Sequence, residues 1–163
     1  MLVHKKSNIF RFLALLLVFI FILPPNANAV DVEVPTSRAS YYLTSYNTYL
    51  YNAALGKIRV YFDVTGVHYM DEIGTLTIQL FESKDNETWT RVKTYTHDAT
   101  AGMLGYNKVY YSGYVEYSGT VGRYYKAYVC IWAGKDGDGD TRYMWTQPQK
   151  ATLFAGYPLF SLP

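Results

Sequence analysis

The sequence predicts an all-β domain, a seven-stranded antiparallel β-sandwich. Three observations support this fold class. From Arg38 onward no stretch has apolar residues at the 3.6-residue spacing of a helix, whereas apolar and polar residues repeatedly alternate with period two. All eighteen tyrosines lie beyond residue 40, and tyrosine suits a pleated, half-buried surface. The extended runs are short, and Gly, Asn, Asp or Pro bounds each one.

Residues 1–29 have the features of a secretory signal peptide. Basic residues precede twelve uninterrupted apolar residues, 12–23, and Ala27-Asn28-Ala29 fits a small-x-small cleavage site. Twelve helical residues rise only about 18 Å, less than the roughly 30 Å of a bilayer's hydrocarbon core. We therefore expect a secreted, extracellular protein that is cleaved after Ala29 and has no membrane association afterwards.

Cleavage changes the charge of the chain. It removes Lys5, Lys6 and Arg11 from the fifteen basic residues, so twelve remain against thirteen Asp and Glu, a net charge of −1. The remaining Lys and Arg are scattered singly, which argues against nucleic acid as a partner. Cys130 is alone and forms no intramolecular disulfide, and an exported protein without disulfides is more typical of a bacterium.

The residues after Ala29 suffice for one domain. We expect an extended linker at 30–39, the β-sandwich at 40–151 and a tail at 152–163. Seven runs are expected as strands, in chain order 41–51, 56–66, 75–80, 89–96, 108–117, 123–133 and 141–148.

The second and third runs alternate most clearly. In Gly56–Gly66 every second residue from Ile58 to Val64 is apolar, which predicts one face in the core and one in water. In the third run Leu76, Ile78 and Leu80 alternate with polar residues. A polar stretch, Ser83–Trp89, follows and predicts a hairpin to the fourth run.

The last two runs flank the loop Gly134–Asp140 and are expected to pair. Placing Ala133 opposite Thr141 sets Ile131 against Tyr143 and Val129 against Trp145 on the inward face. A slip of one residue would exchange the faces. With this register Trp132 stands opposite Arg142, and the outward side chains of the sixth run are Tyr124, Tyr128 and Trp132.

The order of strands, the Ser83–Trp89 hairpin and the strand at 122–129 resemble a fibronectin type III or immunoglobulin-like sandwich over most of residues 40–151. The immunoglobulin cysteine pair is missing, which makes the fibronectin-like version the closer comparison. In such folds a tyrosine at the start of the sixth strand closes onto nearby backbone. The resemblance implies this role for Tyr125 or, failing that, Tyr124.

Several segments resemble a family of small exported proteins of unknown function from clostridia-like Gram-positive bacteria. They are Asp71–Gly74, the Trp89 hairpin, Met103–Asn107 and Gly122–Tyr125. This resemblance implies the compartment and the fold and offers no activity and no functional residues.

Catalysis is not expected from this sequence. Only His68 and His97 remain after cleavage, and neither belongs to a nucleophile, zinc or phosphate-binding motif. A carboxylate pair for glycoside hydrolysis could come from any two of Asp71, Glu72, Glu82 and Glu116, but any sheet protein offers such pairs. We predict a protein that is not an enzyme.

The segment Asp136–Asp140 contains the weak metal candidates Asp136, Asp138 and Asp140, whose alternate spacing suits calcium. Against the helical calcium loop it fails, because Thr141 replaces the required glycine and Gln147 the bidentate glutamate. A soluble hairpin turn is the favoured interpretation, so no cofactor is expected.

Two functions remain as hypotheses. In the first, the outward rings form a flat strip that binds a glycan or another cell-surface ligand, because aromatic faces stack on sugar rings. Its candidate residues are Tyr124, Tyr128, Trp132, Arg142 and Phe81. In the second, the domain has a structural or protein-interaction role in the cell envelope or an extracellular assembly, through the same face or an exposed sheet edge. A third interpretation is that the rings only stabilise the sheet as cross-strand pairs. The oligomeric state is left open.

Overall fold

The computed structural model describes residues 40–155, which form an all-β, antiparallel architecture without helices. The strands are β1 (Leu43–Asn52), β2 (Lys57–Ser83), β3 (Thr90–Thr96), β4 (Leu104–Ser118), β5 (Tyr124–Lys135), β6 (Asp138–Trp145) and β7 (Gln149–Lys150). The predicted all-β class and antiparallel pairing are confirmed. The expected signal peptide at 1–29 and linker at 30–39 lie outside the described residues, among which no helix is long and apolar enough to cross a membrane.

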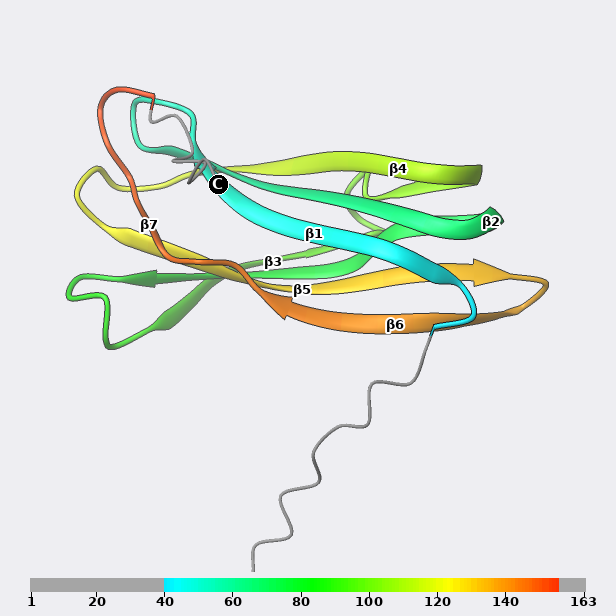
Figure 1. The fold of residues 1–163 in the computed structure, drawn as a ribbon. Helices are drawn as coiled ribbons and strands as arrows, with labels where there is room; N and C mark the ends of the chain where they lie inside the picture. The colour runs from blue at the N-terminus through cyan, green and yellow to red at the C-terminus, as the bar shows by residue number, and fades with distance from the viewer. Residues whose placement is uncertain (1–39, 156–163) are drawn as a thin grey trace, which may run out of the picture. The chain divides into compact units, whose positions relative to one another are not determined.

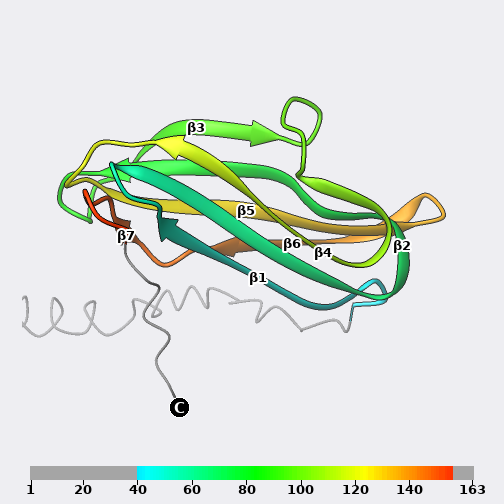
Figure 2. The same cartoon turned by 90° about the horizontal axis from the view of Figure 1, so that it is seen from above.

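Strand β2 organises the sheet. Its first part pairs with β1 on one side and β4 on the other, and its second part pairs with β5 and β3. Strand β6 continues the sheet beyond β5, and β7 pairs with the start of β5. Because β2 bends, the sheet curls on itself. It is one open, curled sheet of seven strands, so two separate sheets of a sandwich are not seen. We call β1, β4 and the start of β2 its first layer, and β3, β5, β6 and the end of β2 its second layer (Figure 1). Figure 2 shows the strands of both layers running along one long direction.

The bend explains why two expected strands are one. The pairing of β2 with β4 shifts between Thr65 and Met70. At Gly66 a Cβ would lie 2.8 Å from the Met70 Cγ, so only glycine lets this side chain pack over the backbone. A bulge and glycines therefore turn the chain without breaking the strand. The expected runs 56–66 and 75–80 merge into β2, and the number of strands stays seven because β7 was not predicted.

The core fills the concave side of the curled sheet. Every second residue from Ile58 to Val64 is at most 1% exposed, which confirms the predicted inward face. Opposite them lie Ile78, Leu80 and the inward face of β5. Leu76 departs from the expected alternation. The pairing with β5 shifts between Thr75 and Thr77, so Thr75 is buried and Leu76 is half-buried.

Tyr125 closes onto nearby backbone, as expected. Its ring is fully buried, and its hydroxyl accepts a hydrogen bond from the Thr120 backbone N–H at 2.8 Å and donates one to Glu82 Oε2 at 2.5 Å. Burial and the Glu82 carboxylate raise the pKa of Tyr125 to about 12. This hydroxyl ties the chain before β5 to the end of β2.

The predicted hairpin between β2 and β3 is confirmed, and Asp85 holds its turn. The Oδ1 atom of Asp85 accepts hydrogen bonds from the Ser83 hydroxyl at 2.8 Å and from the backbone N–H groups of Glu87 and Thr88 at 2.9 and 2.8 Å. The Thr88 and Glu87 N–H bonds, followed by the Ser83 hydroxyl, hold the pKa of Asp85 well below its ordinary range.

We expect Asp85→Ala to lower the free energy of unfolding at neutral pH and to lower it by much less in acid. A lowered folded pKa contributes stability above the unfolded pKa of 3.8, and this contribution is lost as the pH falls through the folded value. Urea unfolding at pH 7 and pH 2.5 measures it. A difference between wild type and variant that is equal at the two pH values would contradict the role of the ionised carboxylate.

Candidate functional site

The β5–β6 hairpin turns through two residues, Asp136 and Gly137, with φ of 55° and 83°. Two positive φ values define a type I′ turn, for which Asp-Gly is a preferred sequence. Lys135 therefore pairs with Asp138, and Trp132 lies opposite Thr141. The expected pairing of Ala133 with Thr141 is wrong by one residue, because Ala133 pairs with Asp140. The expected register requires a loop with an odd number of residues centred on Gly137, whereas the observed turn has two residues.

This register exchanges the faces of β6. Tyr143 and Trp145, which were expected inside, are 61% and 50% exposed. Arg142, which was expected on the outward face beside Trp132, stands opposite the buried Ile131 instead. The Arg142 guanidinium contacts the Asp140 carboxylate at 3.8 Å.

The faces of β5 are as predicted. Val129, Ile131 and Ala133 are fully buried, whereas Tyr124, Tyr128 and Trp132 are half-buried on the outward face. Only the partner strand was assigned to the wrong side, so the predicted outward face gains rings from β6.

These rings form one cluster on the outer face of the second layer, which we call the Trp145 cluster. Its members are Phe81, Trp89, Lys126, Tyr128, Tyr143 and Trp145. The Trp145 centroid lies 4.8 Å from that of Tyr128 and 5.3 Å from that of Phe81. Tyr128 also stacks on Tyr143 at 5.6 Å with an interplanar angle of 12°. The rings thus make a contiguous surface across β2, β5 and β6.

Lys126 binds two of the rings together. Its Nζ lies 4.3 Å from the Trp89 centroid and 4.7 Å from the Trp145 centroid. An ammonium is attracted to the negative face of an indole. The two indoles are therefore held in place by a cation between them, and the cluster carries a positive charge.

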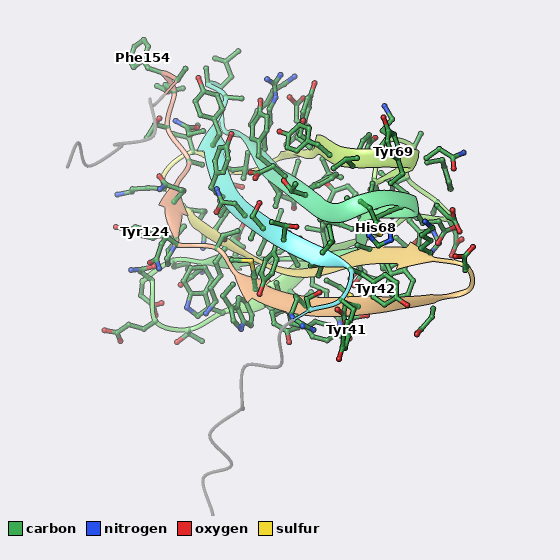
Figure 3. The ribbon with its side chains drawn as sticks, turned by 45° about the vertical axis from the view of Figure 1, so that its right-hand side comes forward. Tyr41, Tyr42, His68, Tyr69, Tyr124 and Phe154 are labelled. Atoms are coloured by element: carbon green, nitrogen blue, oxygen red, sulfur yellow. The ribbon has the colours of Figure 1, made fainter. Side chains whose placement is uncertain are left out.

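The other predicted site residues lie elsewhere. Tyr124 is on the same outward face but contacts Lys150, whose Nζ is 5.2 Å from its ring, at the other end of the sheet from His68 (Figure 3). Trp132 lies over the paired glycines Gly134 and Gly139, where a Cβ would approach its ring to 2.5 Å. The Trp132 Nε1 donates to Glu72 Oε2 at 3.3 Å. Trp132 thus supports the hairpin and is not part of the cluster.

Sequence reasoning missed Trp89, Lys126, Tyr143 and Trp145 as members of this surface. One signal was available for the two residues of β6. Asp136-Gly137 between two extended runs is a strong type I′ hairpin signal, and it sets the register that turns Tyr143 and Trp145 outward.

A second aromatic row lies on the outer face of the first layer, which we call the Tyr61 row. Tyr61 is paired with Tyr49 of β1 and Tyr114 of β4, and the ring centroids are 5.2 and 5.1 Å apart. The Arg59 guanidinium lies over the Tyr114 ring at 4.8 Å. The sequence predicted that this face is exposed to solvent, but it did not predict that tyrosines from three strands lie next to one another there.

The three candidate calcium ligands, Asp136, Asp138 and Asp140, make hydrogen bonds with different residues. The Tyr42 hydroxyl donates to Asp138 Oδ2 at 3.1 Å, and the Ser40 hydroxyl and the Tyr41 N–H donate to Asp140 Oδ2. The Asp136 N–H donates to Asp71 Oδ2 at 2.7 Å. Within residues 40–155, no group of three or more His, Cys, Asp or Glu side chains is arranged to hold a metal.

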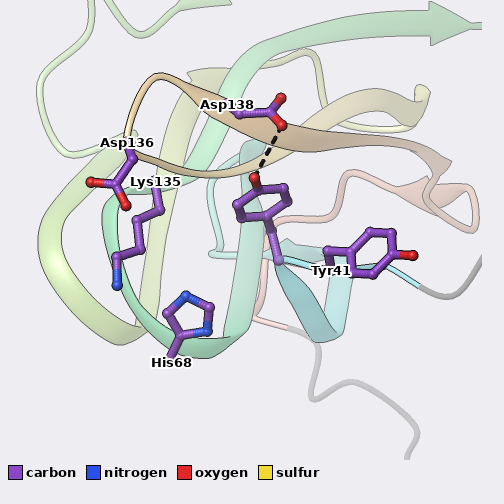
Figure 4. Close-up of a pocket in the computed structure, with 6 residues that line it drawn as sticks. Tyr41, His68, Lys135, Asp136 and Asp138 are labelled. Carbon is purple, nitrogen blue, oxygen red and sulfur yellow. Dashed lines mark hydrogen bonds between the residues drawn. The ribbon is translucent and has the colours of Figure 1, made fainter.

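Asp136 and Asp138 instead line an open pocket of about 380 Å³ beside the bend of β2 (Figure 4). Its other lining residues are Tyr41, Tyr42, His68 and Lys135.

Comparison with known proteins identifies no family. No known family and no curated protein matches the chain. A solved structure described as "X-ray structure of Northeast Structural Genomics Consortium target SoR45" is similar over 73% of this chain and 89% of its own. The sequence identity is 8% and the TM-score 0.35, so this likeness carries no argument about fold family or function.

Proposed function

We propose that this protein is a secreted, non-enzymatic binding domain whose Trp145 cluster holds a glycan chain. The observation that supports this function is the contiguous ring surface, on which Trp145 and Tyr143 are 50% and 61% exposed beside Tyr128 and Phe81. The apolar faces of pyranose rings stack on such side chains. A row of rings across three strands suits successive sugars of one chain.

The fixed position of the indoles also favours binding. Lys126 holds Trp89 and Trp145 through two cation–π contacts, so these rings lose little freedom when a ligand arrives. The Lys126 ammonium is a hydrogen-bond donor next to the stacking surface and suits hydroxyl or carboxylate groups of a sugar.

Export and a fibronectin type III or immunoglobulin-like class belong to the same proposal. The apolar run and small-x-small site before residue 30 support export. The two facing layers and the contact of Tyr125 with the Thr120 backbone support a sandwich of this type.

The double variant Tyr143→Ala, Trp145→Ala tests the glycan site. Both rings are exposed, so the fold is expected to be retained, while loss of two stacking contacts is expected to weaken retention about a hundredfold, roughly tenfold for each ring. The measurement is retention on microcrystalline cellulose, chitin, xylan and purified peptidoglycan. The matched control is Tyr49→Ala, Tyr69→Ala, which removes two exposed rings away from the cluster.

Wild type and control are expected to be retained equally on at least one of these polymers. Absence of wild-type retention on all four, or equal retention of the Tyr143→Ala, Trp145→Ala variant, would overturn the glycan function. The second candidate is a structural or protein-interaction role in an extracellular assembly. The Tyr61 row favours it, because it gives the domain an aromatic surface on its other layer.

A further inference from the structure

Strand β4 has an edge without a partner strand. Among the strands of the described residues, β4 pairs with β2 alone. The Gly119 N–H donates to Gly56 O at 3.0 Å, which directs the backbone groups of residue 119 toward β2. Because backbone groups alternate sides along an antiparallel strand, the even-numbered residues of β4 direct their N–H and C=O away from β2. The Tyr95 hydroxyl, which donates to Glu116 O at 2.8 Å, is consistent with this assignment.

The middle of this edge lacks the usual protection. Exposed edges normally carry charges, proline or a bulge that prevent pairing with another chain. The segment 109–115, Val-Tyr-Tyr-Ser-Gly-Tyr-Val, has no charged residue and no proline. Its alternate residues Tyr110, Ser112 and Tyr114 are exposed on the outer face.

The same segment is complementary to itself. In an antiparallel pair centred on Ser112, Val109 meets Val115, Tyr110 meets Tyr114 and Lys108 meets Glu116, each of them twice. Even-numbered residues face even-numbered residues in this register. The N–H and C=O groups that do not face β2 are therefore directed at each other in the two strands, as a hydrogen-bonded ladder requires. The Glu116 carbonyl already accepts the Tyr95 hydroxyl, and its oxygen has a second lone pair for the partner.

We propose that the partner of β4 is a second copy of this chain, paired antiparallel through β4 about a two-fold axis at Ser112. The first layers of the two copies then form one continuous sheet. Pairing about a two-fold axis closes the assembly at two copies. This interaction does not rest on glycan binding, because it uses the edge of the first layer, whereas the Trp145 cluster is on the second.

The Tyr61 row supports this register. In one copy the row crosses β1, β2 and β4 as Tyr49, Tyr61 and Tyr114. Pairing about Ser112 places the partner's Tyr110 beside Tyr114, which lengthens the row from three rings to four across the dimer seam. Aromatic cross-strand pairs stabilise a sheet.

The charges select the same register. A pair centred on Lys108 would oppose two ammonium groups, and one centred on Glu116 would oppose two carboxylates. Centring on Ser112 brings the partner's Lys108 to Glu116, whose carboxylate also contacts Lys57 at 3.0 Å and Arg59 at 2.9 Å. Lys108 and Glu116 are at the two ends of the paired segment, so their opposite charges act mainly on specificity.

Sedimentation velocity of the chain from residue 30 to 163 tests the association. We expect the wild type to double its mass between about 1 and 100 μM, the range of an affinity near 10 μM. Ser112→Lys places two ammonium groups against each other at the axis and is expected to remain monomeric. The matched control Ser45→Lys puts the same charge on exposed β1, the other edge of the layer, and is expected to associate like the wild type.

A wild type that remains monomeric at 1 mM, or a Ser112→Lys variant that associates as the wild type does, would overturn the proposal. Circular dichroism of each variant shows whether its sheet is intact. If Ser112→Lys unfolds, Ser112→Pro replaces it, because proline is tolerated where the N–H of an edge strand points outward.

Disulfide trapping tests the register. Opposite residues of a hydrogen-bonded pair have Cα atoms about 5.5 Å apart, which is within the range that a disulfide spans. In a Cys130→Ala background, Ser112→Cys lies opposite itself and is expected to form a covalent dimer under mild oxidation. Tyr114→Cys lies opposite the partner's Tyr110 and is expected to form none. Equal trapping of both variants, or trapping of Tyr114→Cys alone, would refute the pairing about Ser112.

Discussion

Replacing Gly74 by alanine is expected to lower the free energy of unfolding by about 3 kcal/mol or more. Gly74 has a φ of 146°, a conformation that L side chains rarely adopt, and an added Cβ would lie 2.2 Å from the Met103 carbonyl oxygen. That oxygen also accepts the Thr75 N–H at 2.8 Å, so it is not free to move. Strain and clash therefore act together where β2 pairs with both β4 and β5.

Urea unfolding of Gly74→Ala measures this loss. The matched control is Gly122→Ala, which also has a positive φ, of 89°, but has no atom within 4 Å of the added Cβ. The control is expected to lose only the conformational cost, about 1 kcal/mol. Equal losses in the two variants would show that contact with the Met103 carbonyl is not what makes Gly74 necessary at the bend.

Tyr125→Phe is expected to destabilise the protein by about 2 kcal/mol at neutral pH. The variant keeps the buried ring and removes the hydroxyl that joins the Thr120 N–H to Glu82. Both groups lose a partner in a partly buried position, which costs more than the net value of a hydrogen bond. Tyr117→Phe, on the ring whose centroid is 5.9 Å from that of Tyr125, is the control and is expected to change stability by less than about 0.5 kcal/mol.

The same hydroxyl predicts a pH dependence. The pKa of Tyr125 is raised from 10.0 to about 12, so the protonated phenol is the form that the fold prefers. Its contribution is complete below pH 10 and is lost as the pH rises through 12. The stability difference between wild type and Tyr125→Phe is therefore expected to shrink in this window. A difference that stays constant from pH 9 to 12 would contradict this assignment.

Local patterns predicted the strands whose two faces meet different environments. The alternation from Ile58 to Val64 placed the core face of β2 correctly, and the alternation in β5 separated Val129 and Ile131 from Tyr128. These predictions succeed because burial of one face imposes period two on the residues of that strand alone. The Ser83–Trp89 turn was predicted for a different but equally local reason, because its polar side chains accept hydrogen bonds from its own backbone.

The candidate site was predicted only in part. Tyr128 and Phe81 were named, but Trp145 and Tyr143 were expected inside. Their side depends on whether the turn has two or three residues, because a shift of one residue moves every side chain of β6 to the other face. The Trp145 cluster also needs Trp89 and Lys126, and no spacing along the chain shows that an ammonium contacts two indoles, one just before β3 and one in β6.

By itself, the sequence determined the all-β class, the inward faces of β2 and β5 and the hairpin that follows β2. The tertiary structure alone decided that β2 passes through both layers, which rings share a surface and which strand edges are without a partner among residues 40–155. The physical reason is that alternation records only whether a side chain is buried. Bends, registers and edges depend on contacts between residues far apart in the chain, such as Gly74 with Met103 and Tyr61 with Tyr114.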